Sequence, residues 1–286
     1  AYTVEAASTK INKTNITIGV GSTYRLKIFN NKKKISWSSS NSNIAKVNKN
    51  GTVTGLKKGT VTITAKVGSK KYKCKVKVTK TPTLKTNMKR AYLDKSGYYV
   101  IEGYVKNKTY TKLESVGITF TIYNKNGKKL SQTSKYIDYM DARGQWKVKA
   151  KFYVGKNANV ASYKTTVSGR YFTRSRYNPN ITAKVKKLKK DGNRYSTTVK
   201  YTNKNNAKLT SMYATYAFYE KKGNIVKTYF DGWRANYVSS TTGKKVKGEL
   251  GNGLKKNKSF TATSTVISID YDIASCKIAE AHGYDL

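Results

Sequence analysis

One segment near the N-terminus carries the clearest structural pattern in the chain. It reads Ile35-Ser-Trp37-Ser-Ser-Ser-Asn41-Ser-Asn-Ile44-Ala-Lys-Val47-Asn-Lys-Asn-Gly51-Thr-Val53-Thr-Gly55-Leu-Lys-Lys-Gly59-Thr-Val61-Thr-Ile63-Thr-Ala65. Small apolar clusters alternate with glycines, which is typical of short strands joined by tight turns. Asn50-Gly51 is a strong hairpin signal, because both residue types tolerate positive φ. The pattern predicts antiparallel strands, with Trp37 in the core or at its edge.

This segment resembles the signature half of a bacterial Ig-like group 2 domain, and the resemblance covers roughly residues 9 to 79. The resemblance implies a β-sandwich module of bacterial surface and secreted proteins. Such modules space, display or adhere, and they do not usually catalyse a reaction.

The rest of the chain contains an internal duplication. Residues 113–127 align with residues 209–223 at a constant offset of 96. In the first copy Val116, Ile118, Phe120 and Ile122 alternate with polar or small residues, which predicts a half-buried antiparallel strand. In the second copy the same alternation places Met212, Ala214, Tyr216 and Phe218 inward, with Tyr213 and Tyr219 outward.

The centre of each copy also carries a short motif. The motifs are Phe120-Thr-Ile122-Tyr123-Asn124 and Tyr216-Ala-Phe218-Tyr219-Glu220. Both are similar to the Phe-x-Leu-Tyr-Asp motif of FxLYD-type domains, although Ile or Phe replaces the Leu and Asn or Glu replaces the Asp. The resemblance implies two further small β-sandwich modules of the extracellular kind.

Two prolines suggest the domain boundaries. Pro82 and Pro179 are the only prolines in the chain, and both lie in turn-forming surroundings. We therefore expect an all-β protein of three tandem Ig-like β-sandwich domains: residues 1–82, 83–177 and 178–286. Helical periodicity is weak throughout, and the best candidate for a short helix is Ile273–Ala281.

The chain is strongly basic over its whole length. Its 286 residues include 58 Lys and Arg against 14 Asp and Glu, a net charge of +44. The three predicted domains carry +17, +15 and +12 in order. Such a charge favours binding to polyanions through counterion release and long-range steering. The alternative interpretation is that the charge keeps a secreted β protein soluble and monomeric.

Lysines alternate with apolar residues in two predicted strands, so that period 2 gathers each set on one face of its sheet. They are Lys73, Lys75 and Lys77, and Lys147, Lys149 and Lys151. These six residues are the candidate contacts to an anionic polymer. Lysines in this arrangement also block edge-to-edge aggregation, and the sequence does not separate the two roles.

Aromatic residues suggest a second kind of site. The chain has 24 Tyr but only 7 Phe, so many rings are expected to keep one end in water. The densest cluster contains Tyr229, Trp233, Arg234 and Tyr237, which are the candidate contacts to a stacked sugar ring. The alternative interpretation places these rings in the sandwich core.

No catalytic constellation is visible. The single His282 lies near the C-terminus without evident partners and is expected on the surface. The carboxylate pairs Asp138/Asp141 and Asp270/Asp272 suit turns or lysine ion pairs better than glycoside hydrolysis or calcium binding. Cys74 is expected to be a buried thiol, and a disulfide to Cys276 is a weaker alternative. We expect no enzyme activity, cofactor or metal.

These observations leave several functions open. The first is a secreted or wall-associated adhesion protein, monomeric, that contacts anionic wall polymers, extracellular polysaccharide or a host glycan or protein. The second is a lectin-like module, and the third a structural spacer of a surface layer or fibre. Nucleic-acid contact would be non-specific, because no recognition motif is present. No segment reads as a transmembrane helix, and Val4-Glu5-Ala6 resembles the end of a secretory signal.

Overall fold

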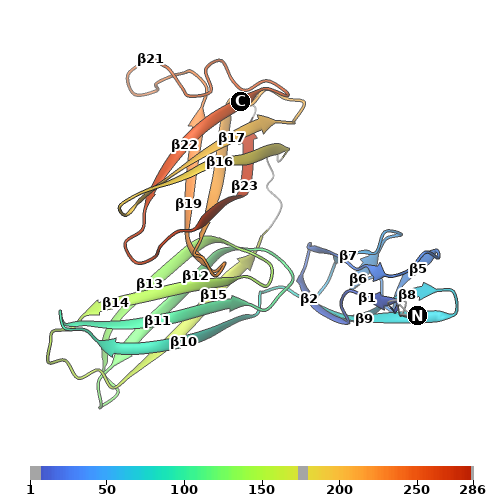
Figure 1. Cartoon of the computed structure of the whole chain (residues 1–286), viewed down its shortest axis with the longest axis horizontal. Helices are drawn as coiled ribbons and strands as arrows, with labels where there is room; N and C mark the ends of the chain where they lie inside the picture. The colour runs from blue at the N-terminus through green and yellow to red at the C-terminus, as the bar shows by residue number, and fades with distance from the viewer. Residues whose placement is uncertain (1–7, 173–179, 285–286) are drawn as a thin grey trace, which may run out of the picture.

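The computed structural model describes residues 8–172 and 180–284, and these parts of the chain form strands and turns without a helix (Figure 1). The predicted all-β sandwich architecture is confirmed. Three separate hydrophobic clusters lie along the chain, and we name the surrounding parts the N-terminal unit (8–82), the middle unit (83–172) and the C-terminal unit (180–284). The signal-like residues 4–6 and Pro179 lie outside the described residues.

The N-terminal unit contains nine strands in three sheets, ordered β2-β9-β8-β5, β3-β7-β6 and β1-β4. Their bounds are β1 Lys10–Ile11, β2 Asn15–Gly19, β3 Thr23–Arg25, β4 Ile28–Phe29, β5 Ile35–Ser39, β6 Ala45–Val47, β7 Thr52–Gly55, β8 Gly59–Val67 and β9 Lys70–Thr79. The core contains Val53, Ile63 and Cys74, and Trp37 packs at its edge. Gly51 has φ of +77°, and an added Cβ would lie 2.5 Å from the Leu26 carbonyl oxygen, so glycine is required there.

The middle unit is a sandwich of two three-stranded sheets, β10-β11-β14 and β13-β12-β15. The bounds are β10 Leu84–Leu93, β11 Tyr98–Asn107, β12 Leu113–Tyr123, β13 Lys129–Met140, β14 Gln145–Tyr153 and β15 Ser162–Tyr171. The predicted alternation in β12 holds, because Val116, Ile118, Phe120 and Ile122 are all fully buried.

The C-terminal unit repeats this arrangement with sheets β16-β17-β22 and β19-β18-β23. The bounds are β16 Ile181–Asp191, β17 Arg194–Asn203, β18 Ser211–Tyr219, β19 Ile225–Arg234, β20 Tyr237–Val238, β21 Lys245–Val246, β22 Ser259–Ile267 and β23 Ser275–Tyr284. The small pair β20 and β21 lies in a connection that the middle unit lacks. Strand β18 buries Met212, Ala214, Tyr216 and Phe218, as its sequence predicted.

The helix expected at Ile273–Ala281 does not form. Those residues belong largely to β23, which pairs with β18 along its length. Cys276 and Ile278 lie two residues apart and both pack on the core, so tertiary packing selects period 2 over the weak helical pattern.

The middle and C-terminal units share one sheet. Strand β14 pairs in parallel with β19 at Trp146 and Ile225, which gives the continuous order β10-β11-β14-β19-β18-β23. In Figure 1 the C-terminal unit stands on the middle unit, whereas the N-terminal unit projects to one side. The chain therefore has two junctions of different construction.

Candidate anion-binding site

The acidic residues are distributed very unevenly. No Asp or Glu occurs between Glu5 and Asp94, a segment that spans the whole described N-terminal unit. Every ion pair found in residues 8–172 and 180–284 joins residues numbered 90 or higher. The lysines of the N-terminal unit therefore face solvent without carboxylates to neutralise them.

A cleft of about 570 Å³ lies at the first junction, between the N-terminal and middle units. Its cationic residues come from both units: Lys75 and Lys77 from β9, Lys108 from the loop after β11, and Arg143 from the turn before β14. Asn15, Thr17 and Tyr110 add polar groups, and no carboxylate lines the cleft. Four cations around one acid-free hollow form a strongly positive local potential.

Strand pairing places the two lysines of β9. Val76 and Val78 face the core, so Lys75 and Lys77 project from the opposite face. Strand β2 runs parallel to β9, with Asn15 opposite Lys75 and Thr17 opposite Lys77. The outer face of this strand pair thus presents hydrogen-bonding groups beside each ammonium group.

Arg143 contributes the guanidinium from the other unit. It has φ of +60°, in the left-handed region that L residues rarely adopt. Its Nη1 donates a hydrogen bond of 2.6 Å to the Lys108 carbonyl oxygen, and its guanidinium carbon lies 5.2 Å from the centre of the Tyr110 ring. The Lys13 ammonium lies 5.7 Å from the same ring, so Tyr110 holds two cations beside the cleft.

Direct hydrogen bonds fix the two walls of the cleft relative to each other. The Tyr110 N–H donates to the Thr17 carbonyl oxygen at 2.7 Å, and the Gly19 N–H donates to Thr111 Oγ1 at 3.0 Å. The Tyr110 ring packs edge-on against Tyr24. The two walls that carry the cationic side chains are therefore held in an ordered contact, which lowers the entropic cost of binding.

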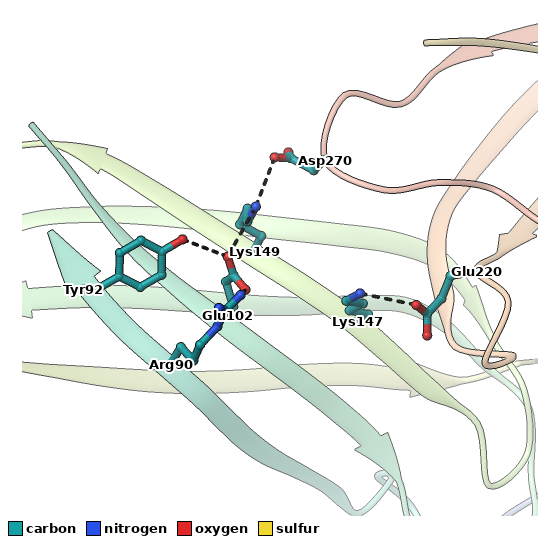
Figure 2. A network of polar contacts seen from close by, with 7 residues as sticks. All are labelled: Arg90, Tyr92, Glu102, Lys147, Lys149, Glu220 and Asp270. Atoms are coloured by element: carbon teal, nitrogen blue, oxygen red, sulfur yellow. Dashed lines mark hydrogen bonds and ion pairs between the residues drawn. The ribbon is translucent and has the colours of Figure 1, made fainter. Parts of the chain in front are cut away.

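The other candidate lysines lie in different surroundings. Lys73 is exposed on β9 outside the cleft lining. Lys147, Lys149 and Lys151 of β14 do not form a free lysine face, because the C-terminal unit covers this part of the sheet. Figure 2 shows Lys147 paired with Glu220 at 3.3 Å and Lys149 held between Glu102 and Asp270, at 3.3 and 3.7 Å. Lys151 also pairs with Asp270. These three lysines connect two units.

The proposed sugar-stacking role of Trp233 does not fit its position. The Trp233 side chain is 7% exposed and packs against Tyr201 and Phe260, so a sugar ring has no access to its face. Tyr229 is half-buried against Tyr216. Arg234 is exposed, and the Tyr237 side chain lies outside the described residues. The core alternative holds for the tryptophan because β19 turns Trp233 toward the sandwich interior.

The remaining reactive groups are engaged in structure. Cys74 and Cys276 are free thiols, and burial raises their pKa to about 11 and about 12, which keeps them protonated at neutral pH. His282 is half-buried on the outer face of its sheet, where it stacks on Tyr213 and lies 3.7 Å from Glu280, and burial lowers its pKa. Asp141 pairs with Lys277, and Asp272 with Lys190. In the described parts of the chain no three His, Cys, Asp or Glu side chains gather as metal ligands.

The comparisons with known proteins identify the first part of the chain. The family model of the bacterial Ig-like domain (group 2) matches residues 5–81. The N-terminal unit is a bacterial Ig-like domain. This confirms the resemblance seen in residues 9–79 and suggests a bacterial surface or adhesion-type module. Domains of this fold are typically non-catalytic and occur in extracellular or surface bacterial proteins. No described helix is long and apolar enough to cross a membrane.

No curated protein matches the chain. Among solved structures, red sea bream transglutaminase is 9% identical with a TM-score of 0.24, over 69% of this chain and 31% of that one. The C-terminal globular domain of an oligosaccharyltransferase from Pyrococcus abyssi is 11% identical with a TM-score of 0.19, over 70% and 45%. An α-2-macroglobulin from Escherichia coli is 8% identical with a TM-score of 0.20, over 97% and 24%. The chain thus spans less than half of each.

Proposed function

We propose that this chain is an extracellular, non-catalytic adhesion protein that holds an anionic polymer in the cleft between its Ig-like unit and its middle unit. The single observation that supports the proposal is the convergence of Lys75, Lys77, Lys108 and Arg143 on a hollow without a carboxylate. Phosphate- or sulfate-bearing chains, such as wall teichoic acids or anionic glycans, have the complementary charge. The middle and C-terminal units would be modules of the FxLYD kind.

Local geometry favours this cleft over the general surface charge. A second hollow, lined by Arg25, Lys27, Lys33 and Lys49, gathers four cations from the N-terminal unit alone. The cleft differs because it brings cations from two units together, across a contact fixed by hydrogen bonds. Each phosphate that a Lys or Arg neutralises releases counterions, so the affinity should fall steeply with salt. A planar guanidinium adds bidentate hydrogen bonding that an ammonium group lacks.

Binding to polyphosphate and to heparin at several salt concentrations tests the proposal. The cleft variant combines Lys75→Gln, Lys77→Gln and Arg143→Gln. The control variant combines Lys184→Gln, Lys187→Gln and Lys189→Gln on β16, where all three lysines are exposed. Both variants lose three positive charges. In the cleft variant, the magnitude of the slope of log affinity against log salt concentration should decrease by about two to three. In the control variant the slope should decrease much less.

Equal losses in the two variants would show that net charge alone attracts the polymer, and the cleft would then have no special role. Absence of binding by the wild-type protein, even at low salt, would overturn the proposal and favour a structural spacer whose charge serves solubility.

A further inference from the structure

The duplicated units differ sharply on the outer face of one sheet. Strand pairing defines equivalent positions: Gly117 lies opposite Tyr136 and Ser168 in the middle unit, and Tyr213 lies opposite Gly232 and His282 in the C-terminal unit. The β12–β13 pair has glycine on its first strand and tyrosine on its second, whereas the β18–β19 pair has tyrosine on its first strand and glycine on its second. Gly117 and Ser168 of the middle unit thus correspond to the rings of Tyr213 and His282, whereas the ring of Tyr136 corresponds to Gly232.

The rings of the C-terminal unit form a continuous row. Phe230 stacks on Tyr213 with centroids 5.5 Å apart, and Tyr213 stacks on His282 at 5.6 Å. Tyr284 meets Tyr213 edge-on at 5.5 Å. The middle unit has Ser134 at the place of Phe230. Gly232 makes room for the row, because a Cβ there would lie 2.6 Å from the Tyr213 ring.

The two ends of this row are accessible to a ligand, whereas the two faces of the central Tyr213 ring are covered by Phe230 and His282. Phe230 is 51% exposed at one end. At the other end Tyr213 and Tyr284 line a cleft of about 560 Å³ together with Arg234 and Asn236. Arg234 is the last residue of β19, and Asn236 lies in the segment 235–258 that follows it and replaces the short turn 141–144 of the middle unit. The rings and the long segment that occur only in the C-terminal unit therefore meet at this cleft.

We infer that this aromatic row and its cleft bind a neutral oligosaccharide. The C–H bonds of a pyranose carry partial positive charge and suit the negative face of an aromatic ring. The cleft is mostly apolar, with a few polar groups at its rim, as is usual for small-ligand sites. The Arg234 guanidinium and the Asn236 amide can bond to sugar hydroxyl groups.

Charge distinguishes this site from the cationic cleft of the first junction. The Glu249 carboxylate lies 3.4 Å from the Arg234 backbone nitrogen, so a carboxylate stands beside the rim. A carboxylate repels phosphate or sulfate but accepts hydrogen bonds from sugar hydroxyl groups. The occupant expected here is accordingly an uncharged sugar chain, and a single-stranded nucleic acid, which would also stack on rings, is disfavoured.

Calorimetric titration of the full chain with two uncharged hexamers, cellohexaose and hexa-N-acetylchitohexaose, tests this inference. The titration is done in about 0.5 M NaCl, because screening there suppresses the general attraction to anions. We expect saturable binding to at least one hexamer. Tyr213→Ala and Phe230→Ala should each lower its affinity at least about fivefold. Tyr136→Ala removes the exchanged tyrosine of the middle unit, which is 70% exposed, and should leave the affinity unchanged.

Absence of binding to both hexamers would overturn the inference. The inference would also be overturned if Tyr136→Ala lowered the affinity as much as Tyr213→Ala does. Binding only to a single-stranded oligonucleotide would overturn it as well. Thermal melting of each variant checks that the C-terminal unit remains folded. Phe230 is the exposed end of the row, so its removal tests the site with the least disturbance. The outcome is independent of the anionic polymer, because neither hexamer carries a charge.

Discussion

Arg143 is the residue at which conformation and chemistry conflict most clearly. A left-handed φ of +60° suits glycine and costs an L residue about 1 kcal/mol or more. The chain has an arginine in that position despite this backbone cost, and Arg143 lines the cleft. Backbone strain of this kind is a reason to suspect a functional role.

Arg143→Gly should therefore separate stability from binding. The free energy of unfolding should change by less than about 1 kcal/mol, because relief of strain offsets the lost hydrogen bond to Lys108. The slope of log affinity for polyphosphate against log salt should fall by about one. Arg143→Lys is the matched control, since it keeps the charge and most of the slope. A glycine variant that binds with the wild-type slope would remove Arg143 from the site.

At the scale of the element, the alternation of residue types predicted the strands well. The buried sets of β12 and β18 follow directly from period 2, and Lys75 and Lys77 were expected on an outer face. The same reasoning failed for β14, because alternation gives the face of a side chain but not what covers that face. It also missed Lys108 and Arg143, which reach the cleft only because a second unit docks there.

Lys149→Glu should loosen the second junction. If the β14 lysines formed a free surface, the same substitution would leave the fold unchanged. Lys149 lies between Glu102 and Asp270, with its side chain 21% exposed, so the substitution would bring three carboxylates together. A loss of about 1–3 kcal/mol is expected, together with a larger radius of gyration in small-angle scattering. Lys164→Glu on the exposed face of β15 is the control. Identical scattering and melting of both variants would contradict this role.

At the scale of the whole molecule, the few acidic residues are concentrated where two units meet. Glu102, Glu220 and Asp270 pair with β14 lysines, Asp138 accepts a hydrogen bond from Thr228, and Asp141 accepts from Tyr139, Tyr219 and Lys277. The first junction has no carboxylate in its cleft. Charge pairing thus stabilises one junction, whereas the other keeps its positive potential for a ligand.

This difference predicts that acid will affect the stability of the N-terminal unit less than that of the middle and C-terminal units. Burial alone would raise the pKa of the Asp141 carboxyl, but hydrogen bonds from Lys277, Tyr219 and Tyr139 together outweigh burial and hold the pKa below its ordinary value. The pKa of the Glu102 carboxyl is lowered in the same way, because hydrogen bonds from Arg90 and Lys149 outweigh the effect of burial. A carboxyl group whose pKa is lower in the folded protein than in the unfolded chain stabilises the fold at pH values above its unfolded pKa, which is near 4. That stabilisation is lost as the pH falls through the pKa of the folded state.

Calorimetric melting between about pH 2.5 and pH 7 should therefore show two behaviours. The melting temperature of the middle and C-terminal units should fall gently below about pH 6.5, because burial disfavours protonation of His282, and more steeply below about pH 4. Asp141→Asn should lower that temperature at pH 7 and flatten the steeper part of its acid dependence. The transition of the N-terminal unit should stay nearly constant, because residues 8–82 contain no carboxyl side chain. An N-terminal transition that falls as steeply as the other would contradict this division. An acid dependence unchanged in Asp141→Asn would show that this carboxylate does not stabilise the second junction.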